Sequence, residues 1–113
     1  MAHAVSPIAI LPNMSFALYA DTEDYRLSLS LASGTAEKFI VPSGAKYVVF
    51  GATEDFCVRY NTTTNGSAAA FGDVTDGSAC EINPTIRYLR DTVVAISVMI
   101  RGATGDVSAV FYK

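Results

Sequence analysis

The stretch KFIVPSGAKYVVFGATEDFCVRY, residues 38–60, decides the fold. It holds three apolar or aromatic runs, which are separated by Pro-Ser-Gly at 42–44 and by Thr-Glu-Asp at 53–55. Short runs of β-branched and aromatic residues between such turn residues are typical of β-strands. The stretch therefore predicts three successive strands joined by tight turns, and their apolar side chains are expected to build a core.

The strand pattern continues on both sides of this stretch. Residues 25–31, YRLSLSL, alternate strictly between apolar and polar side chains, which is the period of a half-buried strand. Residues 15–20 alternate less regularly and can form a hairpin with 25–31 across an acidic turn. Two more strands, at 95–101 and 106–112, are expected to close the chain.

These elements predict an all-β fold. About seven or eight short strands with turn signals every eight to twelve residues are typical of a single-domain antiparallel β-sandwich, here expected to be jelly-roll-like. The one helical candidate is a short turn near 84–89, because Asn83 can cap it and Pro84 suits the first helical position. The sandwich is expected to span residues 15–113.

Two segments lie outside the strand pattern and are the candidate partner contacts. Residues 1–14 predict an extended N-terminal arm, because its two prolines oppose a helix. The apolar residues of this arm either form the first strand or lie on a neighbouring subunit. Residues 61–80 form a long loop with at most a short strand near 69–71, and long loops in small domains are commonly functional. The predicted partner-binding residues are Ile8, Ile10, Leu11 and Phe71.

Composition points to a protein partner. Charged residues make up 17 % of the chain against about 25 % in typical domains, and 50 % of the residues are hydrophobic. Large apolar surfaces usually mark contacts, so part of this surface is expected to be covered by a partner. Eight scattered Lys and Arg residues and a net charge of −3 argue against nucleic-acid binding. No run of about 20 apolar residues predicts a membrane helix, and the N-terminus is a poor signal peptide, so synthesis in the cytoplasm is expected.

The sequence offers little reactive chemistry. His3 is the only histidine, so a Ser-His-Asp or Cys-His nucleophile is not expected, and the chain is predicted not to be an enzyme. Cys57 and Cys80 have no zinc-site spacing and are expected to be two small buried or half-buried thiols; no cofactor is predicted. The acidic residues at 54–55 and 73–77 are expected to be turns, with calcium at 73–77 left open.

Three blocks taken in order resemble a known group. They are FIVPSGAKYVVFGATEDFCVRYN at 39–61, DVTDGSACEINPTIRYL at 73–89, and the closing segments VAISVMIRG and GDVSAVFY. Together they resemble small virion structural proteins of tailed bacteriophages, over residues 38–112. The resemblance does not extend to the N-terminal third of the chain.

The resemblance implies a capsid decoration or cement protein. Such a protein would bind the assembled shell of the major capsid protein, most simply as a homotrimer, and stabilise it. It would be made in the host bacterial cytoplasm and would reside on the capsid surface of the virion. A tail or neck protein of the virion, and a carbohydrate-binding β-sandwich for host attachment, remain alternatives.

Overall fold

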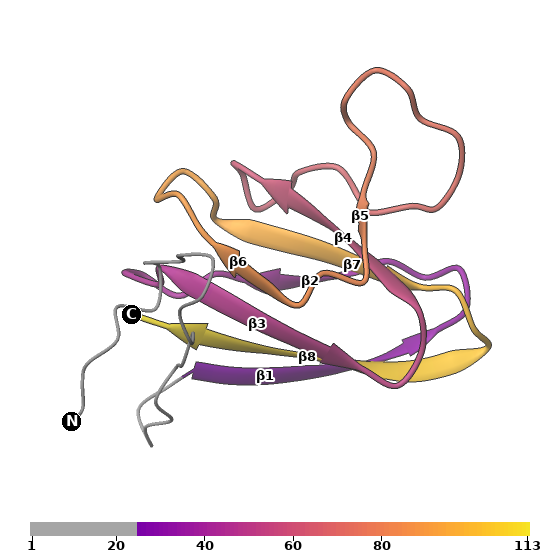
Figure 1. Ribbon diagram of the computed structural model, residues 1–113, viewed down its shortest axis with the longest axis horizontal. Helices are drawn as coiled ribbons and strands as arrows, with labels where there is room; N and C mark the ends of the chain where they lie inside the picture. Colours follow the sequence, from indigo (N-terminus) through magenta and orange to yellow (C-terminus); the bar gives the residue numbers. More distant parts are fainter. Residues whose placement is uncertain (1–24) are drawn as a thin grey trace, which may run out of the picture.

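The computed structural model describes residues 25–113, which form a β-sandwich of eight strands in two four-stranded sheets (Figure 1). Within this range there is no helix, and hence none with the length and apolar character of a membrane span. The strands are β1 (Tyr25–Ala32), β2 (Glu37–Ile40), β3 (Tyr47–Ala52), β4 (Phe56–Asn61), β5 (Glu81–Ile82), β6 (Ile86–Tyr88), β7 (Ala95–Ile100) and β8 (Thr104–Tyr112).

The strand order is that of a jelly roll. Sheet A has the order β1-β8-β3-β6 and sheet B the order β2-β7-β4-β5, and all neighbours are antiparallel. The pairs β1–β8, β2–β7, β3–β6 and β4–β5 are those of one long hairpin, which is rolled so that successive pairs fall in alternate sheets. This arrangement confirms the predicted all-β, jelly-roll-like sandwich.

The predicted helical turn near 84–89 is wrong, because residues 86–88 form strand β6 instead. Ile86 lies opposite Val49 in the sheet, and the N–H of Leu89 donates to the carbonyl of Lys46 at 2.6 Å. Asn83 adopts φ 50°, and its side-chain oxygen accepts the N–H of Phe56 at 2.9 Å. It therefore acts as a turn residue between two strands rather than as a helix cap.

The core lies between the two sheets and is built by alternate residues of the strands. The buried cluster comprises Leu31, Phe39, Val48, Phe50, Phe56, Val58, Leu89, Ile96, Val98, Ile100, Val107, Ala109 and Phe111. Leu27 and Leu29 pack against it as predicted for one face of the 25–31 strand. Strands β1, β2, β3, β4, β7 and β8 thus each contribute one face to the core.

The long loop at 62–80 covers the outer face of sheet B. Asn61 on β4 donates from Nδ2 to the carbonyl of Ser67 at 3.1 Å and to Oγ of Ser97 at 3.0 Å. Ser97 Oγ donates in turn to the same Ser67 carbonyl at 3.0 Å. Ala69 is fully buried, but no strand forms at 69–71. The two central strands of sheet B are therefore covered on both sides.

Two ends of the sandwich differ in their connections. The turns at 33–36, 53–55, 83–85 and 101–103 lie at one end. The connections at 41–46 and 89–94 lie at the other, which we call the terminal end because β1 begins there and β8 ends there (Figure 1). The predicted arm at 1–14 and the predicted strand at 15–20 fall outside the described residues.

Candidate functional site

The outward side of sheet A carries an apolar and aromatic surface at the terminal end. The register places Tyr112, Tyr47 and Tyr88 side by side across β8, β3 and β6. Directly opposite residues in antiparallel strands share a face, and the neighbouring Val48 and Phe111 point into the core. We call this outward surface the tyrosine face; its residues are Tyr47, Val49, Ile86, Tyr88, Val110 and Tyr112.

The tyrosine face grades from a covered centre to an open edge. Tyr47 is 9 % exposed, whereas Tyr88 on edge strand β6 is 57 % exposed. Their ring centroids lie 5.1 Å apart at an interplanar angle of 56°. Burial, and then the neighbouring Tyr88, raise the pKa of Tyr47, so its hydroxyl is neutral at physiological pH. Such a surface, apolar with polar tips, suits contact with another protein segment.

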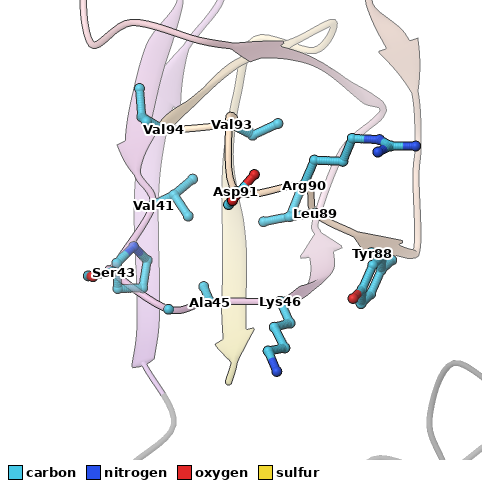
Figure 2. Close-up of a pocket in the computed structure, with 12 residues that line it drawn as sticks. Val41, Ser43, Ala45, Lys46, Tyr88, Leu89, Arg90, Asp91, Val93 and Val94 are labelled. Atoms are coloured by element: carbon cyan, nitrogen blue, oxygen red, sulfur yellow. The ribbon is translucent and has the colours of Figure 1, made fainter.

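A shallow pocket of about 710 Å³ adjoins this face at the terminal end (Figure 2). It lies between the 41–46 and 89–94 connections, which are joined at both ends by backbone hydrogen bonds. The N–H of Leu89 donates to Lys46, and the N–H of Val41 donates to Val94 at 3.0 Å. Val41 and Leu89 point toward one another across it, and Lys46 extends away (Figure 2). The pocket has an apolar floor and a charged rim, which is the make-up of a contact surface.

Each edge strand of the two sheets presents one exposed large hydrophobic side chain. In sheet A these are Tyr25 on β1 and Tyr88 on β6; in sheet B they are Ile40 on β2 and Ile82 on β5. Their exposed fractions range from 49 % to 59 %. Edge strands with apolar side chains can pair with further chain segments. The sandwich therefore offers contacts at its edges as well as on the tyrosine face.

Phe71, the predicted contact residue of the long loop, is half-buried against the body of the sandwich. The guanidinium of Arg101 lies 4.4 Å from the centre of its ring, which is a cation–π contact. Ile82 lies beside it and lines the same small pocket. Phe71 thus holds this part of the loop to the end of β7, and it shares a pocket with the exposed Ile82.

The expectation of two separate buried or half-buried thiols is wrong, because Cys57 and Cys80 form a disulfide. Their Cα atoms lie 5.6 Å apart, within the usual range for a bridge. Cys57 points outward from β4, and the returning long loop brings Cys80 beside it as β5 begins. Arg59 Nη1 donates to the carbonyl of Ser78 at 2.7 Å and fixes the same stretch. Two cysteines 23 residues apart cannot be paired from spacing alone.

A polar network joins the two sheets along the side where β5 and β6 are the edges. The Tyr60 hydroxyl donates to Glu81 Oε1 at 2.8 Å, and Arg87 Nε donates to the same oxygen at 3.1 Å. Arg87 also forms an ion pair with Glu81, in which Nη2 lies against Oε2. The Arg87 hydrogen bond, and secondarily that of Tyr60, lower the pKa of Glu81 against the opposing effect of burial. Burial and Glu81 raise the pKa of Tyr60.

This network should make stability depend on pH in the acid range. A carboxyl group whose pKa is lowered on folding stabilises the fold above its unfolded pKa, near 4.5, and loses that contribution as pH falls through the folded value. Replacing Glu81 by Gln should therefore flatten the acid side of the stability curve, by about 1 kcal/mol or less because Arg87 is half-exposed. Urea unfolding between about pH 3 and pH 7, a range that spans the titration of a Glu carboxyl group, measures this.

The control for this prediction is Tyr60→Phe. It removes one hydroxyl but keeps the Arg87 pair, which is the larger cause of the pKa shift. It should retain most of the acid dependence. A Glu81→Gln variant whose stability falls with acid as steeply as that of the parent chain would contradict the assignment.

The acidic segments serve as turns. Asp55 accepts a hydrogen bond from Asn83 Nδ2 at 3.2 Å, and its carbonyl accepts the N–H of Arg101 at 2.9 Å. Asp76 accepts both the N–H and the hydroxyl of Ser78, and these bonds lower its pKa. Among residues 25–113 no three His, Cys, Asp or Glu side chains gather as metal ligands. The turn interpretation of these two segments is thus supported by their hydrogen bonds.

The predicted contact residues are only partly placed by the structure. Ile8, Ile10 and Leu11 lie outside the described residues, and Phe71 lies on the loop over sheet B. The tyrosine face could not be predicted as a site, because alternation separates the two faces of a strand but does not show which strands are neighbours. Comparison of the chain with protein-family models, curated proteins and solved structures finds no match.

Proposed function

We propose that this chain is a non-enzymatic virion structural protein that binds the assembled capsid of a tailed phage as a decoration or cement protein. The observation that carries the proposal is a jelly roll with an apolar face turned outward. Jelly rolls of eight strands recur in viral capsid proteins. The sequence blocks of residues 38–112 support the same function, because they resemble small phage virion proteins.

The distribution of apolar surface suits a protein that works in many copies. The tyrosine face includes the exposed edge residue Tyr88, and the other three exposed edge residues lie on strands β1, β2 and β5, away from that face. Such a domain can contact both the shell and neighbouring copies, and many weak contacts then add up through avidity. The partners proposed are the major capsid protein and other copies of this chain, with a trimer expected. Ile8, Ile10, Leu11 and Phe71 remain the proposed contact residues.

The disulfide fits a location on the particle surface. Disulfides persist in oxidising surroundings, among them virion surfaces, and are rare in the cytosol. A chain made in the bacterial cytoplasm would form the Cys57–Cys80 bond after release from the cell. The long loop over sheet B would then be locked in place on the finished particle.

The proposed chain would stabilise the shell by binding assembled capsid protein and not free capsid subunits. A protein that binds assembled shells but not free capsid subunits shifts the equilibrium toward the shell. Particles that carry the chain should release their DNA at a higher temperature than particles prepared without it. Fluorescence of a DNA dye during heating measures this difference.

An edge variant sharpens the experiment. Ile82→Asp places a charge on an exposed edge residue and should weaken shell binding on the order of tenfold if β5 meets the shell. Glu37→Gln, on the other edge of sheet B, is the matched control. If particles release their DNA at the same temperature with and without the chain, the cement role is overturned. Recovery of the chain only with separated tails would point to a tail or neck position.

A further inference from the structure

The two sheets differ in what covers their outer faces. On sheet B, the long loop is fixed by the Asn61–Ser67–Ser97 hydrogen bonds, by Arg59 and by the disulfide. The consequence is that even the outward residues Cys57 and Ala95 are fully buried. The chain thus uses one of its own segments to cover an outer sheet face.

The outer face of sheet A is apolar at the tyrosine face and polar along β1, and no such loop covers it in the described range. The connections other than 62–80 are the short segments 33–36, 41–46, 53–55, 83–85, 89–94 and 101–103. Their hydrogen bonds hold them at the two ends of the sandwich. The tyrosine face, with two valines and one isoleucine beside its three tyrosines, therefore has no covering segment among residues 25–113.

The described part of the chain begins close to this face. Tyr25 begins β1 at the terminal end, opposite Phe111, which is next to Tyr112 of the tyrosine face. Strands lie about 4.8 Å apart, so the row from β8 to β6 begins about one strand spacing from β1. The 24 residues before Tyr25 can span roughly 80 Å when extended, which is ample to cross three strands. The segment also carries the apolar residues Ile8, Ile10 and Leu11.

We propose that in the unassembled chain the tyrosine face is the docking site for the chain's own N-terminal segment. The apolar residues of that segment, Ile8, Ile10 and Leu11, are the ones expected to contact Val49, Ile86 and Val110. Docking within one chain is favoured over docking from a second copy, because a short tether keeps the segment at an effective concentration in the millimolar range.

This inference does not depend on the proposed function, since it concerns the isolated chain. It does connect with it. A segment that docks on its own face can dock in the same way on the face of a neighbour, and such exchange is a low-cost route to oligomers. The same residues would then serve the free chain and the assembled one.

Tyrosine nitration by tetranitromethane, located by mass spectrometry, tests the docking. Compared with the full chain, a chain lacking residues 1–14 should be nitrated at Tyr88 and Tyr112 roughly tenfold faster, as for a segment docked about nine-tenths of the time. The triple variant Ile8→Asp, Ile10→Asp, Leu11→Asp should match the deletion. Asn13→Asp, which adds one charge beside the triplet, should keep the protection. Tyr60 on β4 of sheet B, which packs against the core and bonds to Glu81, should be unaffected throughout.

Dilution distinguishes docking within one chain from docking by the N-terminal segment of a second copy. Protection that stays constant on dilution, with the mass of a single chain by light scattering, supports docking within one chain. Protection that disappears on dilution together with a fall in mass would overturn it in favour of a second copy. Equal nitration of Tyr88 and Tyr112 in all variants would overturn docking altogether.

Discussion

Replacing Phe111 by alanine should lower the free energy of unfolding by about 3–5 kcal/mol. Phe111 is 1 % exposed and lies on β8, which is bonded to both β1 and β3 in sheet A. Its ring is part of the layer where the two sheets meet, so its removal leaves a cavity that rigid strands on both sides cannot close. A domain of this size is stable by about 5–15 kcal/mol, so the loss is a large share of the total. Urea unfolding measures it.

Tyr112 provides the matched control, because it tests which side of β8 faces the core. Tyr112 follows Phe111 on the same strand but points to the tyrosine face and is only half-buried. Tyr112→Ala should cost clearly less than Phe111→Ala. Equal losses, or a larger loss at Tyr112, would mean that the inward and outward sides of β8 are reversed.

Removing the Cys57–Cys80 bond should cost about 3 kcal/mol, the second largest effect expected. The bond closes a loop with a sequence separation of 23, which restricts the unfolded chain. It also holds the long loop over sheet B, where Asn61 and Ser97 depend on the Ser67 carbonyl for their buried hydrogen bonds. Thermal unfolding of the oxidised and reduced chains gives the difference.

Proteolysis shows where the effect of this bond is located. In the reduced chain, protease should cut first within 62–80, while the strands remain protected until global unfolding. The double variant Cys57→Ala, Cys80→Ala should behave like the reduced chain and should not respond to reductant. An oxidised chain with the same melting temperature and the same first cut as the reduced one would contradict the role given to the disulfide.

Alternation along the chain was enough to predict most of the strands and the sandwich. The pattern of YRLSLSL predicted the inward face of β1, because period two leaves one face to the core. The runs at 47–52 and 56–61 formed strands near the predicted bounds, because Gly and acidic residues end them. Local patterns are reliable here because they report the side-chain direction of a single strand.

What depends on distant partners could not be predicted from local patterns. Residues 84–89 have the signals of a helix, yet Ile86–Tyr88 pair with β3, since the edge of sheet A supplies hydrogen bonds that a single turn cannot match. The disulfide and the tyrosine face also depend on distant partners. Each needs residues from separate parts of the chain, and their proximity is set by the rolling of the sheets.

Cosedimentation of the purified chain with phage shells prepared without it tests the central claim most directly. The account predicts saturable binding to assembled shells, in a fixed ratio to the capsid protein, and no binding to unassembled capsid subunits. Such a result would support both the virion location and the cement mechanism. Failure to bind shells, or equal binding to free subunits, would contradict the proposed function.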